Sequence, residues 1–192
     1  QFYEKNLVDE IGQMQILEGI IANSNFKLIK PFGDNFMYVV PLIKSFSELK
    51  REGVGPEKFR KMVDGERDAF TQIGDRYHTA GPHKGKMKGV YKDLERNIEK
   101  NSEVAEAYKN YQEKLSKTGY DYDEIILSAV EKLENDEDFR QRVQEQYKYL
   151  LADEHQDTNQ AQNKVLELLG DHTETPNMFV VGDAKQSIYR FQ

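Results

Sequence analysis

The stretch YKYLLADEHQD ends a short apolar run on side chains that could bind a metal ion or a nucleotide. Asp153 and Glu154 follow the run directly, and Gln156 and Asp157 come shortly after them. Many phosphate-handling proteins hold Mg²⁺ through an aspartate placed directly after an apolar strand. A neighbouring glutamate can orient or deprotonate an attacking water molecule. The order of residues therefore points to Asp153 as a magnesium ligand and to Glu154 as a general base.

A simpler explanation of the same stretch is that one of its polar residues caps the next helix. Asp157, Thr158 and Asn159 all precede a helical pattern that begins near Gln160, and each is a preferred N-cap type. Capping accounts for one of these residues. It leaves the preceding carboxylates and the amide unexplained.

The elements that follow this stretch are expected to bring a second pair of residues beside Asp153 and Glu154. YKYLLA is suited to a buried strand, NQAQNKVLELLG to a helix with a glycine stop, and NMFVVGD to a second buried strand. This order predicts a βαβ unit with parallel strands. Ligands of such sheets bind at the carboxyl ends of the strands. We therefore expect Gly182 and Asp183 to lie near Asp153 and Glu154.

The first 117 residues follow a different pattern, in which apolar residues recur at intervals of three and four and predict amphipathic helices. These helices are expected within residues 3–23, 41–53, 56–73 and 91–117, the last closed by Gly119, with another helix after Asp121 or Asp123. We predict a mainly α fold. It comprises a helical subdomain at residues 1–117 and a partial α/β segment with two short parallel strands at residues 118–192.

Composition narrows the class of protein. The 192 residues are 38% hydrophobic and 32% charged, and they contain no cysteine, which excludes disulfides and thiolate metal sites. No apolar run approaches the roughly 18 residues of a membrane span, and the first residues do not resemble a secretion signal. We expect a cytoplasmic protein that does not enter a membrane. The net charge of -7 argues against general polyanion binding.

Two phrases of this sequence together resemble a known family. DEHQDTNQAQ and VVGDAKQSIYRF resemble motifs II and III of superfamily 1 DNA helicases of the UvrD/Rep/PcrA type, which read D-E-x-Q-D and V-G-D-x-x-Q-S-I-Y. The pair, in order and one βαβ unit apart, is highly specific. LKREGVGPEKF and YKNYQEKLSKTGYDYDEII resemble the family's helical insertion less specifically. The resemblance implies a 1B-like insertion at residues 1–117 and part of a RecA-like, 1A-like motor domain at residues 118–192.

The resemblance also implies roles for individual residues. Asp153 would bind the Mg²⁺ of Mg-ATP, and Glu154 would activate the hydrolytic water. The remaining candidates for the nucleotide site are Gln156, Asp157, Asp183 and Gln186. Gln156 and Asp157 would connect the nucleotide to neighbouring motor elements, and Gln186 would contact the γ-phosphate. Those for DNA binding are Tyr189, Arg190 and Phe191, in which the aromatic rings would stack on single-stranded bases. Without the motif, Tyr189 and Phe191 would be assigned to core packing.

The sequence departs from the family's pattern in two places. Gln192 stands where the family usually has an arginine that couples DNA and nucleotide states. No phosphate loop of the form G-x-x-x-x-G-K-[ST] is present, and the near match AGPHKGKM ends on methionine and follows a helix instead of a strand. We expect the phosphate loop upstream and a second motor domain downstream. The isolated chain is therefore expected to lack ATPase activity.

One basic stretch stands out in this acidic chain. Residues 76–92 contain five Lys or Arg and no Asp or Glu. By resemblance to the helical insertion, which often touches duplex DNA, the candidates for phosphate contact are Lys84, Lys86, Lys88 and Lys92. A solvated loop without a ligand explains the same charges equally well.

Three functions remain open from the sequence. The first is a fragment of an ATP-dependent DNA helicase for repair or recombination, with 3′ to 5′ movement implied by the resemblance. The second is a metal-dependent nuclease, because Asp153, Asp183 and Lys185 satisfy a loose D…D-x-K pattern. The third is a non-catalytic helical module that binds DNA or a protein. A fused nuclease domain further along the chain is compatible with the first.

Overall fold

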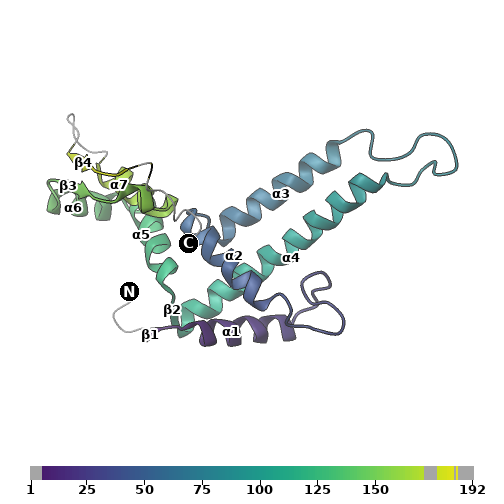
Figure 1. The fold of residues 1–192 in the computed structure, drawn as a ribbon, viewed down its shortest axis with the longest axis horizontal. Helices are drawn as coiled ribbons and strands as arrows, with labels where there is room; N and C mark the ends of the chain where they lie inside the picture. Colours follow the sequence, from purple (N-terminus) through teal and green to yellow (C-terminus); the bar gives the residue numbers. More distant parts are fainter. Residues whose placement is uncertain (1–5, 171–176, 184, 186–192) are drawn as a thin grey trace. The chain divides into compact units, whose positions relative to one another are not determined.

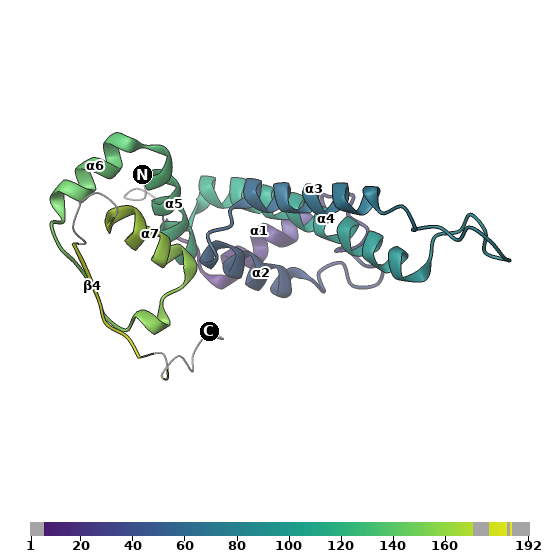
Figure 2. The ribbon, with the colours of Figure 1, turned by 90° about the horizontal axis from the view of Figure 1, so that it is seen from above.

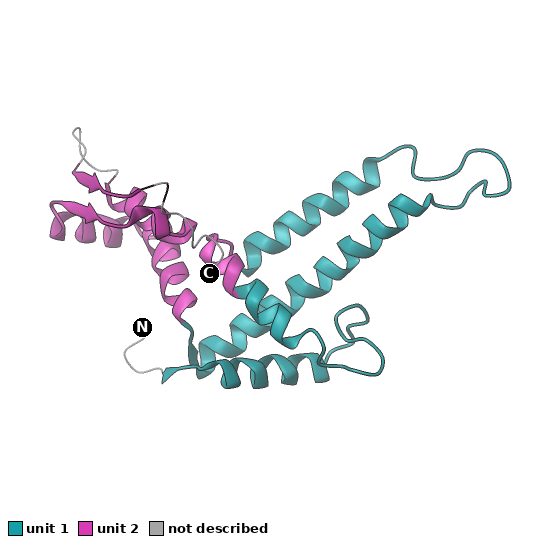
Figure 3. Cartoon of the chain, in the orientation of Figure 1, with its two compact units in different colours: residues 1–46, 55–121 teal, residues 47–54, 122–192 magenta. Residues whose placement is uncertain are grey.

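The computed structural model describes residues 6–170, 177–183 and 185. Over these residues the protein is mainly α-helical and contains two pairs of short parallel strands, of which the sequence predicted one pair. The chain forms two compact units (Figure 3). Unit 1 comprises residues 1–46 and 55–121, and unit 2 comprises residues 47–54 and 122–192. The sequence pattern gave no indication that residues 47–54 group with the later part of the chain.

Unit 1 is built on helices α1 (Glu10–Ala22), α3 (Pro56–Gln72) and α4 (Gly89–Thr118). Helices α3 and α4 lie side by side, joined by a long loop at one end of the pair (Figures 1 and 2). Helix α1 packs on α4 as well. The apolar faces of these helices are buried together, including Leu17, Val63 and Leu115. Burial of the apolar face of each helix contributes most of the stability of amphipathic helices in a folded protein.

Helix α2 (Val39–Arg51) contributes Phe46 to the core of unit 1. The Phe46 ring stacks on Tyr108 with centroids 4.7 Å apart, and it is tilted against Tyr111 at 5.4 Å. All three rings are almost fully buried. Aromatic pairs at such distances add about 0.5–1.5 kcal/mol beyond the burial of their area.

The segment between α1 and α2 is attached to α4 by one carboxylate. Glu103 accepts hydrogen bonds from the backbone N–H groups of Lys27, Leu28 and Ile29, at 2.8, 2.8 and 3.0 Å. These are three consecutive donors outside any helix or strand, and Ile29 is fully buried. The carboxylate gives a partner to the N–H of the buried Ile29, which burial would otherwise leave unsatisfied, and holds the two preceding residues in place.

Unit 1 also contains a parallel strand pair that the sequence pattern did not predict. Strand β1 (Asn6–Leu7) pairs with β2 (Gly119–Tyr120), so Leu7 lies in a strand and not on the first helical stripe. Helix α4 ends before Gly119 as predicted, but the reason differs. Gly119 has an extended φ of 178°, and an added Cβ would lie 2.1 Å from the carbonyl oxygen of Asn6. Close approach of β1, and not a left-handed cap, requires glycine here.

Unit 2 contains helix α5 (Tyr122–Asn135), and the last turns of α2 are bound to its first turn. Lys50, only 1% exposed, forms an ion pair with Glu124 at 3.2 Å. Arg51 donates to Asp123 at 3.1 Å, and the Ser47 hydroxyl donates to the same carboxylate. Carboxylates are favoured at a helix N-terminus, where the backbone N–H groups point outward. These contacts explain why residues 47–54 belong to unit 2.

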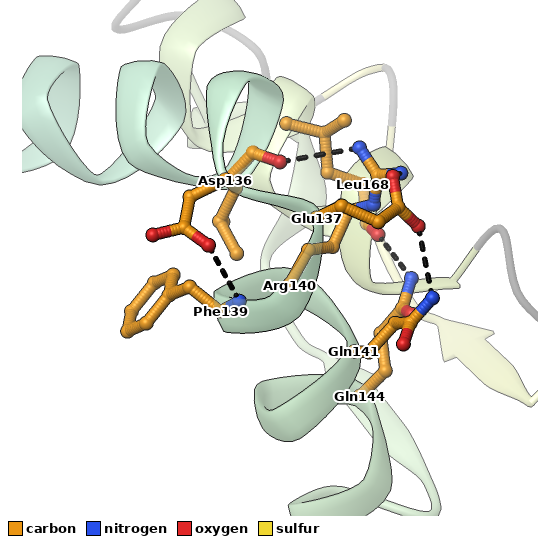
Figure 4. A network of polar contacts seen from close by, with 8 residues as sticks. Asp136, Glu137, Phe139, Arg140, Gln141, Gln144 and Leu168 are labelled. Carbon is orange, nitrogen blue, oxygen red and sulfur yellow. Dashed lines mark hydrogen bonds and ion pairs between the residues drawn. The ribbon is translucent and has the colours of Figure 1, made fainter.

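Helix α6 (Glu137–Gln146) was not predicted from the sequence, and it packs with α5 and α7 (Gln160–Gly170). Asp136 begins it by accepting from the Phe139 N–H at 2.9 Å, as Figure 4 shows. The buried Gln144 donates to the Leu168 carbonyl at 2.8 Å and so binds α6 to the last turn of α7. Arg140 donates to the Leu133 carbonyl at 3.2 Å, which joins α5 to α6.

Strands β3 (Leu150–Ala152) and β4 (Met178–Val180) flank α7 in sequence and pair in parallel, which confirms the predicted βαβ order. The prediction that these strands are buried was wrong. Leu151 is 78% exposed and Phe179 is 65% exposed. With only two strands in this sheet, one row of side chains in each strand has nothing to pack against among the described residues. No described helix is long and apolar enough to cross a membrane.

Candidate functional site

The carboxyl ends of β3 and β4 meet at one edge of their sheet. Leu151 pairs with Phe179 and Ala152 with Val180, so the residues that follow each strand are adjacent. The Val181 N–H donates to the Ala152 carbonyl at 2.8 Å, and the His155 N–H donates to the Val181 carbonyl at 3.0 Å. The structure thus continues the pairing past both strands, into the two polar clusters.

The acidic residues stand exposed at this edge. Asp153 directly follows β3, and its Oδ1 accepts from the backbone N–H of Glu154 at 2.9 Å. Glu154 has a left-handed backbone, with φ 49° and ψ 40°, and leads into the short 3₁₀-helix η1 (His155–Asp157). A positive φ is uncommon outside glycine and costs about 1–3 kcal/mol, and such residues cluster at functional sites. The turn presents two adjacent carboxylates to solvent.

The Gln156 side chain connects the two strand ends. Its Nε2 donates to the Glu154 carboxylate, and its Oε1 accepts from the backbone N–H of Asp183 at 2.9 Å. Gly182 permits this approach, because an added Cβ would lie 2.8 Å from Gln156 Oε1. The Asp183 carboxylate in turn accepts from the Lys185 N–H at 2.9 Å. The expectation that the two polar clusters lie together is confirmed for these residues.

Helix capping explains only the end of the stretch. Asn159 accepts from the Gln162 N–H at 2.9 Å, and the Gln162 side chain accepts from the Asn159 N–H at 3.0 Å, which is a reciprocal capping pair. Thr158 instead makes a hydrogen bond to His155 Nδ1 at 3.0 Å and donates to the His155 carbonyl. His155 therefore has a local structural contact. No hydrogen bond or ion pair within the described residues joins the Asp153 or Glu154 side chain to the start of α7.

The two carboxylates fit a magnesium ion that is shared with a phosphate ligand. In residues 6–170, 177–183 and 185, no cationic side chain forms an ion pair with Asp153, Glu154 or Asp157. No three His, Cys, Asp or Glu side chains in the same ranges gather closely enough to hold one metal ion. Mg²⁺ is usually held by one or two carboxylates, with waters and substrate phosphates as the other ligands. Exposed carboxylates without a cation match that pattern.

Comparison with known proteins decides the family. The model of the UvrD/REP helicase N-terminal domain matches residues 4–192. The chain belongs to the UvrD/REP helicase family. The acidic edge of β3 and β4 carries DEHQD and the described start of the second phrase, residues 180–183. The resemblance read from DEHQD and VVGDAKQSIYRF is confirmed.

Several curated relatives are much longer than this UvrD/REP chain. An ATP-dependent helicase/nuclease subunit from Lactococcus lactis subsp. cremoris is 35% identical over 156 residues, which are 79% of this chain and 12% of that protein. An ATP-dependent helicase/nuclease subunit from Streptococcus agalactiae is 42% identical over 81 residues, 42% of this chain and 6% of that protein. The ATP-dependent DNA helicase PcrA of Leuconostoc citreum is 41% identical over 87 residues, 45% of this chain and 11% of that protein. The chain thus spans about one eighth of the length of the first of these relatives.

Some predicted site residues of this UvrD/REP chain lie outside the described residues. They are Gln186, Tyr189, Arg190 and Phe191, together with the departure at Gln192. Asp157 is exposed, and its carboxylate makes no hydrogen bond or ion pair within the described residues. Of the predicted nucleotide-site residues, the structure therefore describes Asp153, Glu154, Gln156 and Asp183 as a connected group.

The predicted basic stretch forms a hairpin between α3 and α4. Tyr77 bridges Met87 in antiparallel fashion, the His78 N–H donates to the Lys86 carbonyl at 2.9 Å, and the Gly85 N–H donates to the His78 carbonyl at 2.8 Å. Gly81 and Gly85 have φ of 77° and 78°, which favours glycine at both turns. We call residues 76–88 the basic hairpin. It is an ordered turn and not a featureless loop.

The candidate lysines divide into two groups. Lys84, Lys86 and Lys92 are exposed and form no ion pair within the described part of the chain. Lys88 binds Asp75 at 2.9 Å. The first three therefore carry charge that is available to a ligand, whereas the Lys88 ammonium is already bound.

Sequence reasoning missed Asp75, which lies just before the basic stretch. The Tyr91 hydroxyl donates to Asp75 Oδ1 at 2.6 Å, and Lys88 donates to Oδ2 at 2.9 Å. These two donors, Tyr91 first, hold the pKa of Asp75 below its ordinary value of 3.8. The same hydrogen bond raises the pKa of Tyr91 above its ordinary value of 10.0. The only signal in the sequence was an acidic residue next to a basic run.

Proposed function

We propose that this chain is the part of an ATP-dependent DNA helicase that carries the acidic half of the ATP site and a helical DNA-contacting insertion. One observation carries the proposal: two adjacent carboxylates, without a cation partner among the described residues, stand at the carboxyl end of β3, and Gln156 connects Glu154 to the end of β4. Family membership and the names of the relatives support it. Unit 1 would correspond to a 1B-like insertion, and unit 2 to part of a RecA-like motor domain.

In the proposed reaction, Asp153 and Glu154 have separate tasks. Asp153 holds Mg²⁺, which neutralises charge on the phosphates when it is bound. The Glu154 carboxylate takes a proton from water while the water oxygen bonds to the γ-phosphorus of ATP. The bond from the γ-phosphorus to its bridging oxygen breaks, and ADP leaves with that electron pair. Asp157, Asp183 and Gln186 stay as proposed members of the nucleotide site.

The proposed DNA contacts come from two parts of the chain. Lys84, Lys86 and Lys92 of the basic hairpin and the adjoining turn of α4 would bind phosphates of a duplex. The aromatic rings of Tyr189 and Phe191, with Arg190 beside them, would contact single-stranded DNA. We also propose 3′ to 5′ movement, a cytoplasmic location and a role in repair or recombination.

The 192 residues alone are proposed to lack ATPase activity, because their sequence contains no phosphate loop. A phosphate loop and a second motor domain from the rest of the helicase polypeptide would complete the site. Turnover of ATP by the isolated chain, with single-stranded DNA present, would contradict this half-site proposal. DNA cleavage that needs Mg²⁺ but not ATP would instead favour a nuclease.

The decisive test uses Glu154→Gln in the complete helicase polypeptide. We expect ATP hydrolysis to fall by about 10²–10⁴-fold, the usual contribution of general-base catalysis, while ATP binding is retained. Glu145→Gln makes the same change on the exposed face of α6 and should leave turnover unchanged. Unaltered turnover in Glu154→Gln would refute the assigned role.

A further inference from the structure

The Gln156 amide has only one orientation that satisfies both of its partners. A carboxylate only accepts hydrogen bonds, and a backbone N–H only donates. Nε2 must therefore face Glu154, and Oε1 must face the Asp183 N–H at 2.9 Å. Exchanging the two amide atoms would place two donors together on one side and two acceptors on the other. The contact is directional, and it uses one N–H of Nε2 and one lone pair of Oε1.

The backbone around Gln156 fits the opposite strand end closely. The His155 N–H donates to the Val181 carbonyl at 3.0 Å, next to the Gln156 to Asp183 contact. A Cβ on Gly182 would lie 2.8 Å from Gln156 Oε1 and 3.2 Å from the Gln156 and His155 nitrogens. The segment 181–183 therefore lies directly against η1. A shift of this segment would break the hydrogen bond from the Asp183 N–H to Gln156.

Glu154 depends on this contact for its orientation. It stands in a left-handed backbone conformation at an exposed turn, where a flexible side chain has several rotamers open to it. Among the described residues, Gln156 is the side chain that donates to its carboxylate. A general base must lie within hydrogen-bond reach of the water it activates, and small errors in position reduce rate strongly.

We infer that Gln156 is a positioning residue. It orients the Glu154 carboxylate, and the orientation depends on the position of the backbone at Asp183. Gln156 then transmits movement of the β4 end to the hydrolytic base. The inference rests on the proposed function only in taking Glu154 as the base. It assigns Gln156 two contacts within the protein, with Glu154 and with Asp183, that the motif resemblance did not specify.

Two substitutions separate the two hydrogen bonds of Gln156. Gln156→Leu removes both. Gln156→Glu keeps an oxygen for the Asp183 N–H but replaces the donor to Glu154 with a second carboxylate. Like charges at this distance raise the pKa of one member of the pair, so proton uptake by Glu154 from water would need a higher pH. Gln146→Leu, on the exposed end of α6, is the matched control.

The first measurement is steady-state hydrolysis and nucleotide binding in the complete helicase polypeptide. We expect kcat to fall about 10-fold or more in both variants, with the Kd for a fluorescent ATP analogue within about 2-fold of the parent. The acidic limb of the kcat profile should move to higher pH in Gln156→Glu and stay in place in Gln156→Leu. Equal loss of nucleotide affinity in both variants, or unchanged kcat, would overturn the inference.

The second measurement needs no nucleotide. In the 192-residue chain, amide hydrogen exchange at Asp183 should accelerate in Gln156→Leu and stay slow in Gln156→Glu. The Val181 N–H, which donates to Ala152 at 2.8 Å, is the internal reference and should be protected in both. Unchanged protection of the Asp183 N–H in Gln156→Leu would show that this N–H does not depend on a hydrogen bond to Gln156, and would overturn the inference. Failure of the proposed function is separate, since it would appear as full turnover in Glu154→Gln.

Discussion

The backbone of Gly119 lies so close to Asn6 that a Cβ on Gly119 would stand 2.1 Å from the Asn6 carbonyl oxygen. The contact places β1 beside β2 and follows directly on the end of α4. Because φ at Gly119 is extended, the constraint is steric contact alone and not backbone strain.

Gly119→Ala should therefore destabilise unit 1 by about 1–3 kcal/mol, the range for overpacking a closely packed site. Gly65→Ala is the matched control, because Gly65 lies inside α3 with nothing within 4 Å of the added Cβ. That substitution should stabilise the protein by about 0.5–1 kcal/mol through helix propensity. Urea unfolding monitored by circular dichroism measures both. Equal effects of the two substitutions would contradict the steric account.

Glu103→Gln should loosen the segment between α1 and α2. The variant keeps one acceptor oxygen but loses the charge, and the three backbone N–H groups of residues 27–29 share two oxygens in the parent. Since hydrogen bonds to a charged group are each stronger than neutral ones, we expect a loss of about 1–2 kcal/mol. Amide exchange at Leu28 and Ile29 should accelerate. Glu106→Gln, exposed on the same helix, should change neither measurement.

The Asp75 contact at the basic hairpin should hold only within a pH window. The pKa of Asp75 is lowered, so its stabilising effect is complete above 3.8 and is lost as pH falls through the lowered value. The pKa of Tyr91 is raised, so its effect is complete below 10.0 and is lost as pH rises through the raised value.

Carboxyl carbon NMR titration of Asp75 and absorbance titration of Tyr91 measure the two limits. In Asp75→Ala the pKa of Tyr91 should return toward 10.0. Asp93→Ala, exposed on α4, should leave it raised. An ordinary titration of Asp75 in the parent protein would show that the contact does not form in solution.

The basic hairpin should contribute salt-dependent affinity for duplex DNA. Replacing Lys84, Lys86 and Lys92 by Gln should weaken binding and reduce the slope of log K against log salt by about 0.9 for each lysine that contacts a phosphate. The loss should be similar for unrelated sequences, since phosphates carry no sequence information. Fluorescence anisotropy at several salt concentrations measures the slope.

Lys117→Gln removes one charge at the other end of α4 and is the matched control for Lys86→Gln alone. It should leave the slope nearly unchanged. Equal slopes for Lys117→Gln and Lys86→Gln would mean that net charge, and not the hairpin, sets the affinity. In that case the basic stretch is a solvated turn without a DNA contact.

The sequence pattern predicted the long helices and the parallel βαβ order well, because burial of one face imposes a regular spacing on each element. It missed α6, whose segment EDFRQRVQEQ has only Phe139 and Val143 as apolar residues. It also missed β1, which is two residues long. The predicted burial of β3 and β4 was wrong because apolar content alone does not say whether a partner layer is present.

By itself, the sequence determined which chemistry the acidic stretch can support and which family it resembles, because those depend on residue types and local order. Only the tertiary structure decided that the Gln156 side chain bonds both Glu154 and Asp183. It also decided that Asp75 accepts hydrogen bonds from Lys88 and Tyr91. The same holds for the close approach of the Asn6 backbone, which leaves no room for a side chain at Gly119. Several of these pairings join residues far apart in the chain. All depend on the path of the backbone and on the direction of individual hydrogen-bond donors. The spacing of apolar residues along the sequence predicts neither of these.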